Sequence, residues 1–153
     1  MDTKEKTLSS LSRVFHFFSQ DIEALPEEAF ARSQGGKART VADIVHEVNL
    51  TNDCLRQHLL GEPVLIRPNA QTTAPDDLNT KDAVMQSFKT SSGQVIQAVK
   101  QLSVAQMEET IPGETGEGTR ADHCRAMTVH LWYHSGQLNY IQTLLGDDAM
   151  HWS

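Results

Sequence analysis

The sequence predicts an all-α protein, a four-helix bundle with a long crossover between its second and third helices. Apolar residues recur at intervals of three and four along four long segments, which is the period of an amphipathic helix. No segment shows the strict apolar and polar alternation of a half-buried strand. Four amphipathic helices bury their apolar faces by packing on one another, so a bundle is the expected architecture.

The first helix is predicted from a stripe of apolar residues that ends before a proline. Pro26 lacks a backbone N–H and its ring blocks the preceding turn, so the helix ends at or before this residue. The stripe consists of Leu8, Leu11, Phe15, Phe18, Ile22 and Leu25. We expect it to face the core.

The second helix is predicted from about Val41 to Leu60, with recognisable signals at both ends. Thr40 is placed to accept a hydrogen bond from the first turn, as N-cap residues do. Gly61 followed by Pro63 is typical of the residues just beyond a helix end. The boundaries of this helix are therefore well defined by the sequence.

A long connection leads from the second helix to the third. Residues 61–79 carry three prolines among polar residues, and we interpret them as a crossover rather than a domain boundary. We therefore expect one domain over residues 1–153, a length suited to a single core. The third helix follows Asn79 and Thr80 and ends near Ser103.

The last third of the chain contains one long helix between less regular segments. Residues 104–109 could form a short helical turn, and the glycine-rich residues 112–118 are predicted to be a flexible loop. The fourth long helix is expected over about residues 120–145, with Gly146 beyond its end. The tail, residues 147–153, offers little to pack.

Composition narrows the classes of partner. The net charge of −7 and the mixing of basic with acidic residues leave no basic patch, which disfavours nucleic acid. No apolar run approaches the length of a membrane span, and Met1–Lys6 lacks the features of a signal peptide. We therefore expect no membrane partner and a cytoplasmic location. Cys54 and Cys124 are then reduced thiols, and neither belongs to a CxxC motif.

Two histidines in the fourth long helix have the spacing of metal ligands. His130 and His134 are four residues apart, so they lie about 40° apart on one helix face. They share an inward stripe with His123, Met127, Leu138, Ile141 and Leu145. Two histidines cannot hold a catalytic metal alone, so a third ligand must come from another helix.

Other residues of this helix are candidates for supporting positions. His123 lies two turns before His130, about 10 Å along the axis, which is too far to bind the same ion, so we expect it to line a pocket. Gln137 lies one turn from His134 and could support it from the pocket side. Tyr133 is a weaker candidate for the pocket, with packing at a helix interface as the simpler interpretation.

The second helix offers two neighbouring candidates for the third ligand, His46 and Glu47. Both lie off its apolar stripe, Glu47 by about 110° and His46 by about 150° on a helical wheel. Glu47 is slightly better placed, but a solvated helix face would also explain either residue. Both alternatives stay open at this point.

These motifs resemble the DinB/YfiT-like family of metalloenzymes. The resemblance is carried by Thr40-Val-Ala-Asp-Ile-Val-His-Glu-Val48 and by His130-x-x-x-His134-Ser-Gly-Gln137, and it extends to helix order and length. It implies a bundle of the up-down-down-up type, in which one histidine of helix two and an HxxxH pair of helix four hold a divalent ion. His130 and His134 match that pair, and nickel or zinc is the implied metal, with manganese and iron as alternatives.

The second helix departs from the family pattern. The position of the family's metal-binding histidine falls at Glu47, with His46 one residue early, and Ser135 stands where an arginine is common. Either Glu47 binds, or a small rotation of the helix brings in His46. A carboxylate is an acceptable ligand for zinc, iron, manganese or nickel.

Three hypotheses about function follow. The first is a metal-dependent enzyme, a hydrolase or a thiol-dependent transferase, that acts on a small molecule such as a thiol. The second is a non-enzymatic metal-binding protein with a role in stress response or protein interaction. The third is a chain that binds no metal, because its ligand set has degenerated. The resemblance suggests the first class without naming a substrate.

Trp132 lies on the side of the fourth long helix away from the stripe. It either marks a second interface, for which a homodimer is the commonest arrangement, or packs under the crossover of residues 61–79.

Overall fold

Four long helices form most of the molecule in the computed structural model, which describes residues 1–153. They are α1 (Thr3–Ala24), α2 (Val41–Leu60), α3 (Lys81–Gln101) and α5 (Arg120–Leu144). Shorter elements lie between them: the 3-10 turns η1 (Glu27–Ala29) and η2 (Asp76–Leu78), the short helix α4 (Val104–Glu108), and the strands β1 (Thr110–Gly113) and β2 (Gly116–Thr119). The predicted all-α fold class is confirmed.

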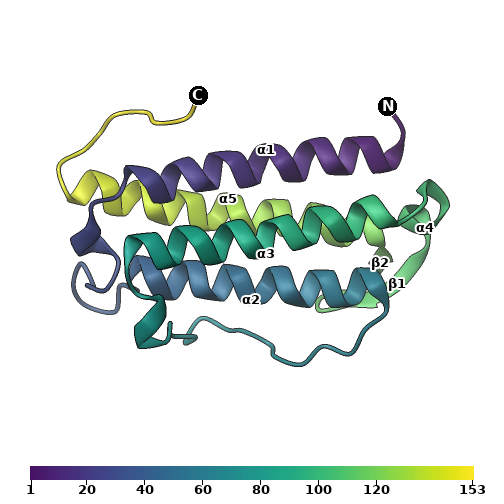
Figure 1. The fold of residues 1–153 in the computed structure, drawn as a ribbon, viewed down its shortest axis with the longest axis horizontal. Helices are drawn as coiled ribbons and strands as arrows, with labels where there is room; N and C mark the ends of the chain where they lie inside the picture. Colours follow the sequence, from purple (N-terminus) through teal and green to yellow (C-terminus); the bar gives the residue numbers. More distant parts are fainter.

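The helices have the predicted up-down-down-up order (Figure 1). α1 and α5 run in one direction, and α2 and α3 run in the other, because the crossover of residues 61–80 returns along the outside of α2. α1 packs on α3 and α5, and α2 packs on the same two helices. The contact between α2 and α5 is the least extensive of the four, which leaves room for side chains and a cavity between them.

One cluster of 27 buried apolar residues forms the core. Leu11, Phe18 and Ile22 of the predicted first stripe have no exposed surface. The ring of Phe88 on α3 packs against Phe18 at 5.0 Å and against Phe15 at 5.9 Å between centroids. Burial of such side chains stabilises the fold by about 1.5–3 kcal/mol each.

The predicted helix ends of α2 and α3 are confirmed by their capping contacts. The Thr40 hydroxyl accepts a hydrogen bond from the N–H of Asp43, and the Thr80 hydroxyl accepts one from Ala83. Gly61 ends α2 with a φ of 70°, in the left-handed region that glycine adopts without strain.

The prediction of a flexible loop at residues 112–118 is wrong, because these residues are part of a short antiparallel hairpin that no alternating pattern in the sequence indicated. Thr110 pairs with Thr119 and Gly113 with Gly116. Nε2 of His123 donates to the carbonyl of Ile111 at 3.1 Å, and the ring lies directly against Gly113. A Cβ at Gly113 would lie 2.2 Å from the His123 ring, so this close contact requires glycine.

The C-terminal tail is also packed, contrary to expectation. The Trp152 indole stacks on Phe17 at 5.1 Å, and its Nε1 donates to Asp21 at 2.7 Å. Trp132 lies against Phe17 and Trp152, at 6.0 and 5.4 Å, so the idea that it packs under the crossover is wrong. Leu145 is 38% exposed and leaves the predicted stripe, because α5 ends one residue earlier.

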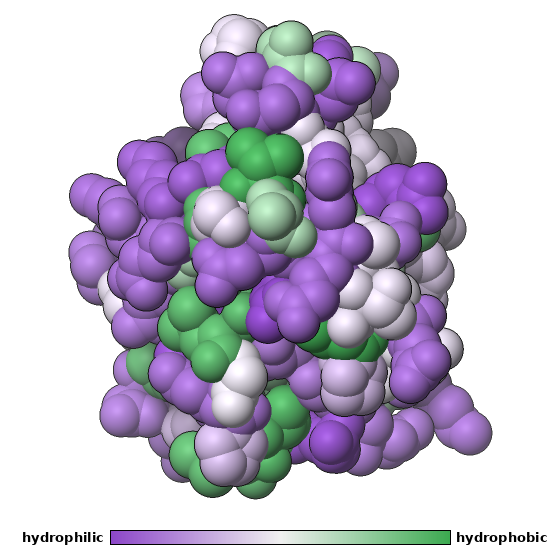
Figure 2. All heavy atoms as spheres, turned by 90° about the vertical axis from the view of Figure 1, so that its right-hand side faces the viewer, coloured by the Kyte–Doolittle hydropathy of each residue, from purple (hydrophilic) through white to green (hydrophobic).

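The end of the bundle that carries the hairpin is covered mainly by hydrophilic side chains, with hydrophobic ones in separate patches (Figure 2). No helix combines the length and hydropathy needed to cross a membrane.

Candidate metal centre

Three side chains from two helices converge between α2 and α5. Glu47 of α2 meets His130 and His134 of α5, and one donor atom from each residue lies within 4.8 Å of the others. Nε2 of His130 lies 3.2 Å from Oε1 of Glu47, and Nε2 of His134 lies 3.0 Å from Oε2. His46, the alternative to Glu47, is partly buried but lies outside this group.

Glu47 lies off the apolar stripe because α2 contacts two neighbouring helices. Its contact with α3 is partly polar: Asn52 donates to Ser91, and the Ser91 hydroxyl donates to Asn49. The stripe therefore points into the core between α3 and α5, and Glu47 lies to one side of it, toward α5. A position that a helical wheel places off the core can thus still be buried, as Glu47 is at 7% exposure.

The Nε2 atoms of His130 and His134 form no hydrogen bond. Both are buried, and neither has a hydrogen-bond partner, although Glu47 is close, because the ring geometry does not aim them along a hydrogen bond to its oxygens. Buried polar atoms in folded proteins are nearly always paired, so two orphans side by side require an explanation. A shared cation would satisfy both of them.

The spacing of the donors also fits a cation. Bonds from zinc to nitrogen or oxygen are about 2.0–2.2 Å long, which places neighbouring ligand atoms about 2.8–3.6 Å apart for bond angles between 90° and the tetrahedral value. The two contacts of Glu47, at 3.0 and 3.2 Å, fall within that range. Two imidazoles and one carboxylate are also a donor set that zinc, nickel, iron and manganese accept. The residues therefore fit a divalent ion.

Gln137 fixes the orientation of His134. Nδ1 of His134 lies 2.6 Å from Oε1 of Gln137, and since an amide oxygen only accepts, the ring nitrogen donates. A neutral ring with its proton on Nδ1 presents the Nε2 lone pair to the site. Gln137 does not line the cavity, but its Nε2 donates to the hydroxyl of Tyr133 at 3.4 Å. Tyr133 itself is largely exposed.

Arg39 holds the Glu47 carboxylate and was not foreseen from the sequence. Its guanidinium donates to Oε2 of Glu47 at 2.9 Å and to the carbonyls of Asp43 and Thr72, at 3.0 and 2.9 Å. Burial by itself raises the pKa of Glu47, but the contacts with His130, His134 and Arg39 together outweigh it and hold the pKa well below its ordinary value. The carboxylate is therefore ionised, as a metal ligand must be.

The only sequence signal for Arg39 is its position directly before the cap of the helix that carries Glu47. The partner carbonyl of Thr72 lies on the crossover, 33 residues away in sequence, and no local pattern predicts that contact.

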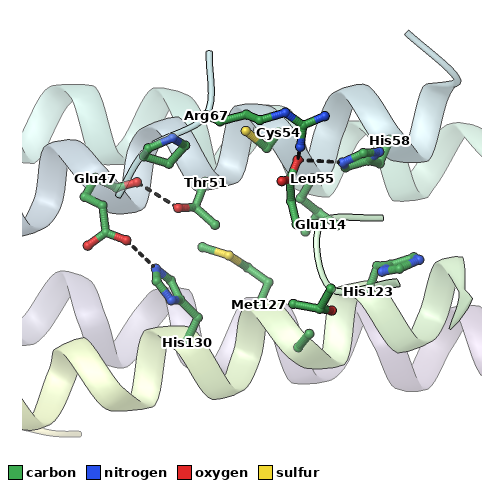
Figure 3. A pocket seen from close by; sticks show the side chains of 13 residues that line it. Glu47, Thr51, Cys54, Leu55, His58, Arg67, Glu114, His123, Met127 and His130 are labelled. Atoms are coloured by element: carbon green, nitrogen blue, oxygen red, sulfur yellow. Dashed lines mark hydrogen bonds and ion pairs between the residues drawn. The ribbon is translucent and has the colours of Figure 1, made fainter. Parts of the chain in front are cut away.

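A cavity of about 320 Å³ is lined by two of the three ligand candidates, Glu47 and His130, and runs between α2 and α5 toward the hairpin (Figure 3). Glu47 and His130 lie at one end, and His123 lines the other, where the sequence predicted a pocket residue. Cys54 lines the cavity and donates to the carbonyl of Ile66 at 2.9 Å. Burial raises its pKa, and it raises the pKa of Cys124 to about 12, so both free thiols are poor nucleophiles.

Comparison with known proteins places the sequence in a family. A search of curated proteins found no match. The sequence model of the DinB superfamily matches residues 10–138, a range that includes Glu47, His130 and His134 and reaches into all four long helices. Since the match spans most of the chain, this protein belongs to the DinB superfamily.

Proposed function

We propose that this protein is a metal-dependent enzyme that acts on a small molecule, by hydrolysis or by transfer to a thiol. The observation that carries the proposal is the pair of buried, unpartnered Nε2 atoms of His130 and His134, which meet the Glu47 carboxylate beside a cavity. In this reading Glu47, His130 and His134 hold a divalent ion. Nickel or zinc is the first choice, with manganese and iron as alternatives.

Each neighbouring residue has a defined role in this proposal. Gln137 keeps the proton of His134 on Nδ1, and Arg39 orients the Glu47 carboxylate while it offsets part of its charge. A divalent ion in this place lowers the pKa of a water or thiol bound to it, which is the chemistry that hydrolysis and thiol transfer share. The cavity walls exclude bulk water from one side of the site and position the substrate.

A non-enzymatic metal protein is the alternative. Structural zinc sites use four protein ligands, which close the coordination sphere. The group between α2 and α5 contains only three candidate ligands, Glu47, His130 and His134, and a cavity lies beside it. Three ligands with adjoining space favour a site that remains accessible to water or substrate.

The proposal is tested first by metal content and metal titration. Protein purified without chelators is analysed for its elements, and the chelator-treated form is titrated with nickel, zinc, manganese and iron. One tight equivalent per chain in the wild type is expected, with loss of that equivalent in His130→Ala. His46→Ala is the matched control, since His46 adjoins Glu47 in sequence and lies outside the cluster. Equal binding by all three proteins would contradict the assignment.

A second measurement separates a functional from a structural ion. If the ion serves chemistry, the metal-free protein is expected to keep its helical circular dichroism and its melting transition. That result would justify a screen of the metal-loaded protein with ester, amide and thiol-transfer substrates. Unfolding upon metal removal would instead favour the structural alternative.

A further inference from the structure

The cavity has a second polar end, about three turns of α2 away from the metal centre. Glu47 and His58 are eleven residues apart on α2, which corresponds to about 16 Å along the helix axis. Both line the cavity, one at each end, and Arg67 of the crossover joins His58 at the far end (Figure 3). This second end is unrelated to the three ligand candidates and needs its own explanation.

A carboxylate of the protein lies at this far end. Glu114, in the turn between β1 and β2, receives a hydrogen bond from Nε2 of His58 at 3.0 Å and an ion pair from Nη1 of Arg67. Both contacts go to the same oxygen, Oε1. The hydrogen bond from His58, together with the charge of Arg67, outweighs desolvation and lowers the pKa of Glu114. The far end is thus a place that stabilises a carboxylate anion.

Glu114 is weakly held there. The Arg67 side chain is 60% exposed and that of Glu114 is 41% exposed, and ion pairs with such exposure contribute about 0–1 kcal/mol. The hairpin does not depend on this contact, because His123 holds the Ile111 carbonyl and Arg120 pairs with Glu109 at its base. A competing carboxylate that uses both of its oxygens could displace Glu114 without unfolding the hairpin.

The middle of the cavity is less polar than its ends. Leu55 of α2 and Ala126 and Met127 of α5 line it at helix positions between its two ends, where the only polar lining side chains of these helices are the hydroxyl of Thr51 and the thiol of Cys54. A ligand that fills the cavity would therefore place a metal-binding group beside His130, an aliphatic segment along these side chains, and an anion at Arg67. The volume of about 320 Å³ is at the lower end of small-molecule sites.

We propose that the substrate carries a carboxylate group, which replaces Glu114 between Arg67 and His58 when it binds. The planar fork of an arginine matches a carboxylate with two parallel hydrogen bonds, and Glu114 shows that the site accepts this anion. The proposal rests on the metal-dependent function above and adds the chemical class of the substrate to it. The Glu114 side chain then competes with the substrate carboxylate for the site between Arg67 and His58.

The test uses ω-mercaptoalkanoates, whose thiol binds zinc at one end and whose carboxylate can reach Arg67 at the other. Mercaptoalkanols of equal length are the neutral controls. Calorimetry of the zinc-loaded wild type is expected to show that the acids bind more tightly than the alcohols, by about tenfold in affinity. This preference should appear only when the alkyl chain of the ligand is long enough to span the cavity. Equal affinity of acids and alcohols at every length would overturn the proposal.

Two variants sharpen this experiment. Arg67→Gln is expected to remove the carboxylate preference while alcohols bind as before, and Glu114→Gln is expected to strengthen the binding of acids alone. Arg125→Gln is the matched control, because Arg125 is a largely exposed α5 arginine that does not line this cavity. If Arg67→Gln weakens acids and alcohols equally, or Glu114→Gln weakens acids, the contacts merely hold the hairpin and the proposal fails.

A metal-free arm separates this proposal from the one it rests on. Octanoate and octanol carry no thiol, so their binding to the chelator-treated protein reports the Arg67 end alone. A preference for octanoate that Arg67→Gln removes supports the carboxylate site even if zinc fails to bind. Zinc binding without any octanoate or mercaptoalkanoate preference leaves the metal centre standing and rejects the carboxylate site.

Discussion

Two buried carboxylates lie on different sides of α5, and their neighbours make them different in kind. Asp21 of α1 accepts hydrogen bonds from Ser135, Asn139 and Trp152, at 3.1 and 2.7 Å for the last two. Every donor is neutral, and none of these side-chain atoms is buried without a hydrogen-bond partner. Glu47 of α2 instead faces two imidazole nitrogens that have none. Since His134 and Ser135 are consecutive, a single turn of α5 contributes to both clusters.

The comparison distinguishes a polar cluster that supports the fold from one that can bind a ligand. Burial raises the pKa of Asp21, and the hydrogen bonds from Ser135, Trp152 and Asn139 offset only part of that effect. Burial also acts to raise the pKa of Glu47, but its close contacts with His130, His134 and the Arg39 guanidinium outweigh burial and lower the pKa. The donors around Asp21 offer no nitrogen lone pair to an ion, whereas the Glu47 cluster contains two imidazole Nε2 atoms without a hydrogen-bond partner.

The largest expected difference is in metal affinity. Glu47→Ala is expected to weaken binding of zinc or nickel by more than the roughly 10- to 100-fold that loss of a supporting outer group causes, because a ligand itself is removed. Asp21→Ala is expected to keep the affinity of the folded protein within a few-fold of wild type. Calorimetric titration of both variants measures this, and similar losses in the two would erase the distinction.

For the free energy of unfolding, the larger loss is expected at Asp21 and not at Glu47. Asp21→Ala leaves the Ser135, Asn139 and Trp152 donors without their acceptor, and should lower the free energy of unfolding by about 2–4 kcal/mol. Urea unfolding of the metal-free protein gives the value. Asp148→Ala, at an exposed position of the tail, serves as the control and should change it by less than about 0.5 kcal/mol. A loss below about 1 kcal/mol for Asp21→Ala would mean that the cluster is not structural.

A smaller effect on metal affinity is expected at Gln137, which contacts only His134 among the three ligand candidates. Gln137→Met removes the acceptor for Nδ1 and frees the ring to change its tautomer, so metal affinity should fall about 10-fold. The mutation leaves all three ligand candidates in place. Stoichiometry should therefore stay at one ion per chain, and a complete loss of binding would show that Gln137 does more than orient the ring.

The smallest expected effect is a dependence of stability on pH that comes from Asp21. The pKa of Asp21 is raised in the folded state above its ordinary 3.8, so the folded state binds this proton more tightly than the unfolded state does. Its contribution is complete below pH 3.8 and is lost as the pH rises through the folded pKa. Urea unfolding from pH 3.5 upward should show the wild type losing stability relative to Asp21→Asn, and a constant difference would contradict this.

The helices could be predicted from the sequence because their signals are local. The stripe that includes Leu11, Phe18 and Ile22 marks α1, and Thr40 and Gly61 mark both ends of α2 through contacts within a few residues. The parallel course of α2 and α3 followed from the family resemblance, and the long crossover is consistent with it. Local periodicity and capping therefore account for most of the architecture.

The hairpin and the tail were missed because long-range contacts stabilise them. The strands contain Pro112 and three glycines and have no apolar alternation, and their packing depends on the His123 ring. Trp152 reaches a partner that is 131 residues away in sequence. Neither contact leaves a local pattern.

The candidate site could be predicted in part. The spacing of His130 and His134 and the neighbouring pair in α2 were visible, but a helical wheel could not choose between Glu47 and His46. That choice depends on how α2 is rotated between α3 and α5, which is a property of the packed bundle. The roles of Arg39 and Glu114 could not be predicted for the same reason. Their partners, Glu47 for Arg39 and His58 and Arg67 for Glu114, come near them only in the folded protein.

The crossover of residues 61–80 has a consequence for how this scaffold could diversify. Its return along α2 places a loop, with Arg67 and Pro68, over a cavity that is otherwise lined by α2, α5 and the turn of the hairpin. Loops tolerate substitution and insertion far better than packed helices do. Descendants of such a chain could therefore acquire new selectivity through changes in this loop while the helices that carry Glu47, His130 and His134 stay unchanged. Substrate recognition and the candidate metal centre would then evolve on separate parts of one small protein.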